Sequence, residues 1–142
     1  MTSRSLIIYT DGGARGNPGP AAVGVVISDD DQDVAAFGQA IGSATNNEAE
    51  YQAVLASLNY LLQHRDLIQG RTLEWRMDSL LVASQLSGKY KIKEPRLKQL
   101  ASQCLSLFGQ LEISYHITHI PRHQNARADG LVNQSLDADL EQ

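Results

Sequence analysis

Four carboxylates stand out because each falls at the end of a predicted strand or on the inner face of a predicted helix. They are Asp11, Glu50, Asp78 and Asp129. Oxygen ligands without a cluster of His or Cys suit Mg²⁺ or Mn²⁺ better than zinc. Four carboxylates can hold two such ions ~3.5–4 Å apart, an arrangement that stabilises the attacking and the leaving oxygen in phosphoryl transfer. If the fold brings the four together, the natural chemistry is phosphodiester hydrolysis.

Asp11 and Asp78 each follow a run of β-forming residues, at positions 6–9 and 71–77. In open α/β sheets, sites lie beyond the carboxyl ends of strands, so both side chains are expected at one edge of the sheet. The Gly- and Pro-rich residues 12–20 predict a loop directly after Asp11. For either aspartate, the simpler alternative is a turn or cap residue, since Asp is common at both.

Glu50 lies on a predicted helix that begins with a capping box formed by Thr45 and Glu48. Glu48 is expected to cap this helix and to face solvent. Glu50 is instead in phase with an apolar stripe, reached in steps of four, four and three residues: Val54, Leu58 and Leu61. A carboxylate on an apolar face is costly unless something compensates it, and a bound cation is the usual compensation.

Asp129 repeats this argument in the last predicted helix, where steps of three and four residues lead from it along the apolar face. Four carboxylates are therefore expected to converge from two strand ends and two helices. The alternative is that Glu50 and Asp129 only hydrogen-bond in the core, or pair with Arg122 or Arg127. Buried ion pairs of that kind also occur as structural features.

The elements that must position these side chains follow the order β-β-β-α-β-α-α-β-α, which predicts an α/β fold with a five-stranded mixed sheet flanked by helices. Three strands with short loops are expected to form an antiparallel meander, followed by two further strands. The first strand is expected to be buried on both faces, because residues 6–9 do not alternate. The predicted strands are residues 5–10, 21–27, 34–41, 71–77 and 112–120, and the predicted helices are residues 45–62, 79–86, 95–108 and 125–136.

The 142 residues fit one domain spanning residues 1–142, with residues 1–4 and 137–142 expected to be frayed. No apolar run approaches the ~20 residues of a membrane span, and the first residues lack the apolar segment of a signal peptide. We therefore expect a cytoplasmic monomer without membrane contacts. The single cysteine, Cys104, is expected to be a buried apolar filler rather than a nucleophile.

The net charge of −4, with 12 Lys and Arg against 16 Asp and Glu, argues against binding of nucleic acid through overall charge. It is compatible with a local basic patch. Lys89, Lys91 and Lys93 surround Tyr90 in the one basic cluster that contains an aromatic residue, and such a cluster could hold phosphates. The alternative is a solvated loop.

Four sequence blocks, each carrying one of the four carboxylates, resemble the successive signatures of type 1 ribonuclease H. They are YTDGGARGNPGP, TNNEAEYQAV, MDSLLV and HIPRHQNARAD. The chain most resembles the short, archaeal-like branch, which lacks the basic helical protrusion and the N-terminal hybrid-binding domain of other members. The resemblance implies a ribonuclease H-like fold over almost the whole chain.

The same resemblance implies an endonuclease that hydrolyses the RNA strand of RNA/DNA hybrids with two Mg²⁺ or Mn²⁺ ions, leaving 5′-phosphate and 3′-hydroxyl ends. Duplex RNA is a further candidate substrate. On the family pattern, the four carboxylates match the metal ligands, which agrees with the argument from helix faces. The alternatives are a non-catalytic hybrid-binding module, against which the intact carboxylates speak, and another nuclease of the same fold.

Positions that match hybrid contacts of the family are Gly12, Gly13, Asn17, Asn46 and Asn47. A glycine backbone can approach a sugar-phosphate strand closely and read the ribose 2′-OH that separates RNA from DNA. The asparagines could hydrogen-bond base edges in the minor groove. A plain turn for the glycines, and helix capping for one asparagine, are the alternatives.

His123 is the nearest match to the family's flexible histidine, and Arg122 beside it could take part of that role. Histidine changes charge near neutral pH, so His123 could pass a proton to the leaving 3′ oxygen or help the product to leave. A solvated surface histidine is the alternative. Leu80 departs from the family pattern, because many relatives carry a substrate-contacting glutamine there.

Overall fold

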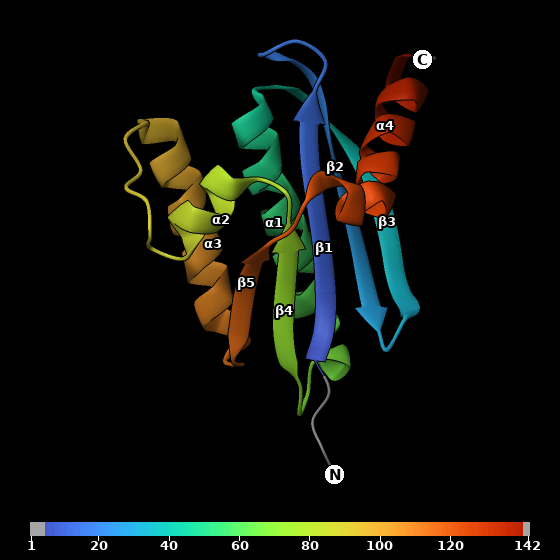
Figure 1. Cartoon of the computed structure of the whole chain (residues 1–142), viewed down its shortest axis with the longest axis vertical. Coiled ribbons are helices and arrows are strands. Elements are labelled where there is room, and N and C mark those ends of the chain that lie inside the picture. The colour runs from blue at the N-terminus through green and yellow to red at the C-terminus, as the bar shows by residue number, and fades with distance from the viewer. Residues whose placement is uncertain (1–4, 141–142) are drawn as a thin grey trace.

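The computed structural model describes residues 5–140, which form a five-stranded sheet flanked by helices (Figure 1). The strands are β1 (Ser5–Ala14), β2 (Gly19–Asp29), β3 (Gln32–Ala44), β4 (Thr72–Met77) and β5 (Tyr115–His119). The helices are α1 (Asn46–Gln63), α2 (Leu80–Leu86), α3 (Pro95–Leu111) and α4 (Ala126–Leu140), with 3₁₀ turns η1 (Arg65–Leu67) and η2 (Arg122–Asn125). Within the described residues, no helix combines the length and the apolar character that a membrane crossing requires.

The sheet order is β3-β2-β1-β4-β5. The first three strands pair antiparallel in succession, whereas β4 runs parallel to β1 and β5 runs parallel to β4. The predicted α/β fold, the mixed sheet and the antiparallel meander are therefore confirmed. Because β1 and β4 are parallel, their carboxyl ends lie at the same edge of the sheet, as the argument about Asp11 and Asp78 requires.

Helices α1 and α4 lie on opposite sides of the sheet (Figure 1). Helix α1 packs on β1 and β2 and against α3, and this side holds the larger core, in which Tyr51 and Trp75 are fully buried. Helix α4 packs on β2 and β3 over a smaller apolar cluster. That cluster consists of Ala22, Val132 and Leu136.

Helix α1 begins as predicted. The Glu48 N–H donates to Thr45 Oγ1 at 3.1 Å, and the Thr45 N–H donates to Glu48 Oε1 at 2.8 Å, which completes the capping box. The predicted apolar stripe is buried, with Val54, Leu58 and Leu61 each 0% exposed. The phase of this helix, which decides where Glu50 points, was therefore predicted correctly.

Strand β1 corrects the prediction of burial on both faces. Leu6 and Ile8 are buried toward α1, whereas Ile7 and Tyr9 are partly exposed on the other face. They line an open groove of about 720 Å³, because α4 covers β2 and β3 and leaves this part of β1 uncovered. Arg76 of β4 lies over the Tyr9 ring, 5.7 Å from its centroid.

Strand β1 also extends further than predicted. It continues to Ala14, so Asp11, Gly12 and Gly13 are strand residues paired with β2 rather than loop or turn residues. A run of glycines after an apolar segment predicts a turn, but here pairing with β2 keeps the backbone extended through it.

Other boundaries differ as well: β2 and β3 are longer than the predicted residues 21–27 and 34–41, and α3 ends at Leu111 rather than at residue 108. Strand β5 begins at Tyr115, because Glu112 adopts a left-handed conformation (φ 56°) that ends α3. Helix α4 continues to Leu140 instead of ending near residue 136, and Asp137 in its last turns bonds Arg15 Nη2 at 2.7 Å. Residues 1–4 and 141–142, which were expected to be frayed, lie outside the described residues.

Cys104 lies on the buried face of α3 and is 0% exposed. Burial raises the pKa of its thiol to about 12, which disfavours the thiolate that a nucleophile needs. The prediction that Cys104 is a packing residue is confirmed.

Candidate active site

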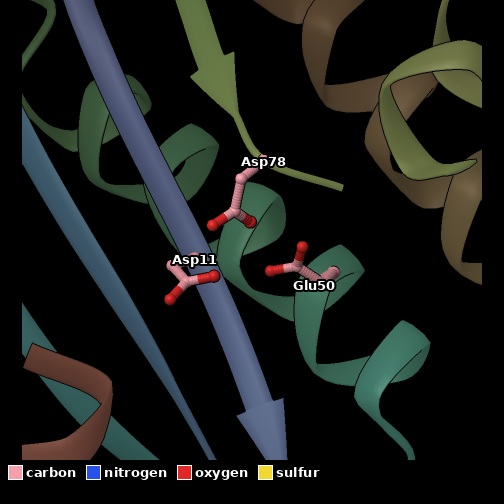
Figure 2. Close-up of side chains that lie close together, drawn as sticks. All are labelled: Asp11, Glu50 and Asp78. Atoms are coloured by element: carbon pink, nitrogen blue, oxygen red, sulfur yellow. The ribbon is translucent and has the colours of Figure 1, made fainter. Parts of the chain in front are cut away.

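Three carboxylates from three separate elements meet where the pairing of β1 with β4 ends. Asp11 comes from β1, Glu50 from the first turns of α1, and Asp78 directly follows β4. Each offers an oxygen that lies within 4.8 Å of the other two. Figure 2 shows the three side chains turned toward a common space. The structure therefore brings together three of the four acidic residues that the sequence singled out.

The site forms because β4 ends before β1 does. Their pairing stops at Thr10 and Met77, and β1 runs on beside β2 alone. The N-terminal part of α1 packs against β1 at this point. The Gly12 N–H donates to Glu50 Oε1 at 2.5 Å, so the helix carboxylate is bound directly to the strand that carries Asp11.

Gly12 permits this contact because it has no side chain. A Cβ at this position would lie 2.2 Å from the backbone carbon and oxygen of Ala49, and 2.6 Å from the backbone nitrogen of Glu50. Any larger residue would push α1, and Glu50 with it, away from β1. The close approach predicted for Gly12 is therefore an approach to α1, and its N–H is engaged within the protein rather than offered to a ribose.

The three carboxylates repel one another in a site largely shielded from water. Burial raises the pKa of Asp11 to about 7, and the nearby charge of Asp78 adds to this effect. Burial also raises the pKa of Glu50 well above its ordinary value, followed by the charges of Asp11 and Asp78. A divalent cation would relieve the repulsion, and a donor set made only of carboxylate oxygens suits a hard cation such as Mg²⁺ or Mn²⁺. The residues present thus fit a metal site.

Asp129 lies beside this group but does not belong to it. Its charge contributes, after burial and the charge of Asp78, to the raised pKa of Asp11, and its side chain is 36% exposed and lies 4.0 Å from Arg122 Nη2. Helix α4 reaches Asp11 across β2, where Gly24 is the pairing partner of Asp11. A Cβ on Gly24 would lie 2.3 Å from the Ala128 carbonyl oxygen, so α4 rests directly on the strand backbone.

Comparison with known proteins identifies the family to which the chain belongs. A protein-family model described as reverse transcriptase-like matches residues 9–135. The chain is 43% identical to the ribonuclease HI of Halobacterium salinarum over 130 residues, 91% of this chain and 63% of that protein. It is also similar to the structure of LC11-RNase H1, isolated from compost by a metagenomic approach, with a TM-score of 0.91, 44% identity, and coverage of 96% of this chain and 98% of that one. The chain belongs to the type 1 ribonuclease H family.

LC11-RNase H1 has also been solved in complex with an RNA/DNA hybrid. That structure is 44% identical to this ribonuclease H family member, with a TM-score of 0.90, and the match covers 95% of this chain and 99% of that one. Some relatives are longer. The chain spans 63% of the halobacterial protein and 36% of a bifunctional protein of Mycobacterium tuberculosis, to which it is 40% identical over 94% of its own length.

The residues predicted to contact the hybrid lie on the same two elements as Asp11 and Glu50, or directly after them. The Asn46 N–H donates to Asn17 Oδ1 at 2.9 Å, and the Ala14 N–H donates to Asn46 Oδ1 at 2.9 Å. These bonds tie the loop after β1 to the start of α1. They use the amide oxygens, so the NH₂ groups are the atoms these two side chains could offer to a nucleic acid. Asn47, in the same first turn, is partly exposed, and so is Gly13.

The other predicted residues lie at the periphery. His123 is exposed and sits in η2 between Arg122 and Asn125, in a 3₁₀ turn rather than the predicted loop. The charge of Arg122 reaches Asp78, although its side chain is 84% exposed. Leu80 is 50% exposed in the first turn of α2.

The predicted basic cluster lies in the segment between α2 and α3. Lys89, Lys91 and Lys93 are exposed there, together with Tyr90. This exposure leaves their charges accessible to a phosphate backbone, as the prediction requires.

Sequence reasoning missed Asn125, which it treated only as the first residue of the last helix. Asn125 is 1% exposed, and its Nδ2 donates to the Thr10 carbonyl at 2.9 Å, directly before Asp11 in the chain. A signal was present, because Asn125 lies one helical turn before Asp129 on the same face. An asparagine at the start of a helix is so common as a cap that its position alone did not point inward.

Proposed function

We propose that this protein is an endonuclease that hydrolyses the RNA strand of RNA/DNA hybrids. One observation carries the proposal: Asp11, Glu50 and Asp78 reach the same point from three elements, with oxygens within 4.8 Å of one another. Membership of the ribonuclease H family, and the hybrid bound by LC11-RNase H1, support RNA/DNA hybrid as the substrate class.

Asp11, Glu50 and Asp78 would hold the divalent cations, and Asp129 would complete the site from the solvent side. Mg²⁺ or Mn²⁺, two ions per site, would activate the attacking water and stabilise the charge on the leaving oxygen. Burial prepares the three carboxylates for this task, since their mutual repulsion in the absence of a cation favours binding of positive charge.

The surrounding residues would place the hybrid. The Gly13 backbone lies next to Asp11 and would approach the ribose, while the amide donors of Asn17, Asn46 and Asn47 would bond acceptors in the minor groove. Lys89 and Lys91 would hold phosphates of the DNA strand, with Lys93 and Tyr90 in the same segment. With so few positive charges, each phosphate contact should add ~0.7–0.9 to the salt dependence of a modest affinity.

His123 would donate a proton to the leaving 3′ oxygen, and Arg122, whose guanidinium does not release a proton, would stabilise the negative charge on that oxygen. Both lie in η2, which begins just after β5 and touches the site through Asn125. Protonation of the 3′ oxygen as the bond to phosphorus breaks would leave a 3′-hydroxyl on one fragment and a 5′-phosphate on the other.

Labelled hybrid, duplex RNA, duplex DNA and single strands, incubated with Mg²⁺, test the proposal. We expect cleavage of the RNA strand in the hybrid, and no cleavage by Asp11→Asn at unchanged folding. Polymerase extension of one fragment and ligation of the other would identify the ends. Equal cutting of duplex DNA would contradict the substrate, and activity retained in Asp11→Asn would contradict the mechanism.

A further inference from the structure

Asn125 is a buried amide at the junction of η2 and α4. Only 1% of its surface is exposed, and its Nδ2 donates to the Thr10 carbonyl oxygen at 2.9 Å. Thr10 is itself 1% exposed and directly precedes Asp11 on β1. The start of α4 is therefore bonded to the strand position next to the most buried aspartate of the site.

The same side chain also lies beside Asp78, where burial raises the pKa of the carboxylate and the Asn125 amide is one of the groups that lower it. An asparagine NH₂ group carries two N–H donors, so it can serve the Thr10 carbonyl and the Asp78 carboxylate together. Both groups are acceptors, and the bond to Thr10 fixes the orientation of the amide with its nitrogen toward β1.

The amide oxygen of Asn125 gives no reason for an asparagine at this position. Asn125 Oδ1 is buried and has no hydrogen-bond partner within residues 5–140. A buried acceptor without a partner destabilises a fold, and an apolar side chain of similar shape would avoid that cost. The polar side chain is therefore explained by its NH₂ group, which bonds β1 directly before Asp11.

We propose that Asn125 is a positioning residue whose amide sets the spacing of Asp11, Asp78 and Asp129. Its side chain bonds β1 directly before Asp11 and lies beside Asp78, which follows β4. Its backbone leads into α4, on which Asp129 follows one turn later. Since these are the carboxylates assigned to the metals, the inference rests on the proposed function, and it predicts that Asn125 controls the affinity of the site for divalent cations.

Mn²⁺ binding, followed by the electron paramagnetic resonance signal of the free ion, gives a readout that does not depend on catalysis. We expect Asn125→Ala and Asn125→Leu to bind Mn²⁺ about 10-fold or more weakly than the wild type, in the range found for outer-sphere partners of metal ligands. Cleavage of a hybrid at low Mg²⁺ should fall in proportion and recover at high Mg²⁺, while KM for the hybrid stays unchanged.

The two variants separate positioning from packing. Asn125→Leu fills the site and removes the unpartnered oxygen, so it should fold at least as well as Asn125→Ala and still lose Mn²⁺ affinity. Gln124→Ala, an exposed neighbour in η2, should bind Mn²⁺ like the wild type. Ser57→Ala removes a buried hydrogen bond to Trp75 away from the site, and should lower the melting temperature without changing Mn²⁺ affinity.

Wild-type Mn²⁺ affinity in both Asn125 variants would overturn the inference. So would an equal loss of affinity in Ser57→Ala, because that would make it a consequence of lower stability. If the wild-type protein binds Mn²⁺ but cuts no hybrid, the proposed function fails, and the role of Asn125 is then decided by the binding measurements alone.

Discussion

Helices α1 and α4 each bring an acidic residue to Asp11, and they are held in place differently. Helix α1 rests on the Gly12 backbone and is buried along its length between the sheet and α3. Helix α4 rests on the Gly24 backbone, over a small apolar cluster, and is tied at its ends by exposed ion pairs. Those pairs join Arg127 to Asp33, and Arg15 to Asp137.

This difference means that α1 is anchored more firmly than α4. Exposed ion pairs contribute ~0–1 kcal/mol each, whereas burial of apolar side chains is the dominant stabilising term of a fold. Glu50 is therefore fixed by the core, in direct hydrogen-bonding contact with β1. Asp129 is partly exposed on a helix with weaker anchors, so its position should tolerate more change than that of Glu50.

The largest effect is expected where α1 meets β1. Gly12→Ala places a Cβ 2.2 Å from the backbone of Ala49, which cannot move without moving Glu50. We expect at least ~100-fold slower hybrid cleavage and a free energy of unfolding lower by about 1–3 kcal/mol. Single-turnover cleavage and urea unfolding measure the two effects.

Gly109→Ala is the matched control for that substitution. Gly109 is an exposed helical glycine with no atom within 4 Å of its would-be Cβ, so alanine there should leave cleavage unchanged and stabilise the protein by up to ~1 kcal/mol. Near-normal cleavage by Gly12→Ala would show that α1 can shift without loss of the site.

Substitution of the two helix carboxylates compares the helices directly. Glu50→Gln should reduce cleavage by about 100-fold or more at any Mg²⁺ concentration, because it replaces a charged carboxylate in the buried cluster with a neutral amide. Asp129→Asn should cost only about 10-fold and should recover in part at high Mg²⁺. Cleavage rates over a Mg²⁺ titration give both numbers, and equal losses in the two variants would remove the proposed difference between α1 and α4.

The pH dependence of stability tests the repulsion in the buried cluster. Asp11 has a pKa of about 7 in the folded protein against an ordinary value of 3.8, so the folded state holds a proton that the unfolded chain has released. In EDTA, the free energy of unfolding should therefore decrease as the pH rises from about 4 to about 7, by about 1–3 kcal/mol.

Asp11→Asn should flatten this dependence and raise the stability of the metal-free protein at pH 8. Urea unfolding at a series of pH values measures the free energy of unfolding. Asp129→Asn is the comparison, and it should change the pH dependence less than Asp11→Asn does. If Asp11→Asn keeps the wild-type dependence of the free energy of unfolding on pH, a group other than Asp11 is responsible for that dependence.

The smallest effect is expected at the exposed anchors of α4. Arg127→Ala removes an ion pair whose partners are 63% and 30% exposed, so the melting temperature should change little. Whatever change occurs should vanish at about 0.5 M salt, where charges are screened. A double-mutant cycle with Asp33→Ala isolates the pair, and a large coupling would show that α4 is held more firmly than its packing suggests.

Local patterns were sufficient for the elements and for part of the site. The capping box and apolar stripe gave the start and the phase of α1, and from these the inward direction of Glu50 followed. The same reasoning placed Asp129 on the inner face of α4, yet its side chain is 36% exposed, because phase does not tell how closely a helix lies on the sheet. Burial of β1 on both faces was wrong for a similar reason, since coverage of the second face depends on where α4 packs.

The sequence by itself determined the acidic residues available, the mixed sheet, and the edge of the sheet at which Asp11 and Asp78 meet, because these follow from local periodicity and from the parallel pairing it implies. Only the tertiary structure decided that Gly12 serves contact with α1, and that Asn125 bonds Thr10 across the fold. Both depend on distances between segments far apart in the chain, which no local pattern encodes. Close approach of backbones and the burial of an amide arise only when whole elements pack together.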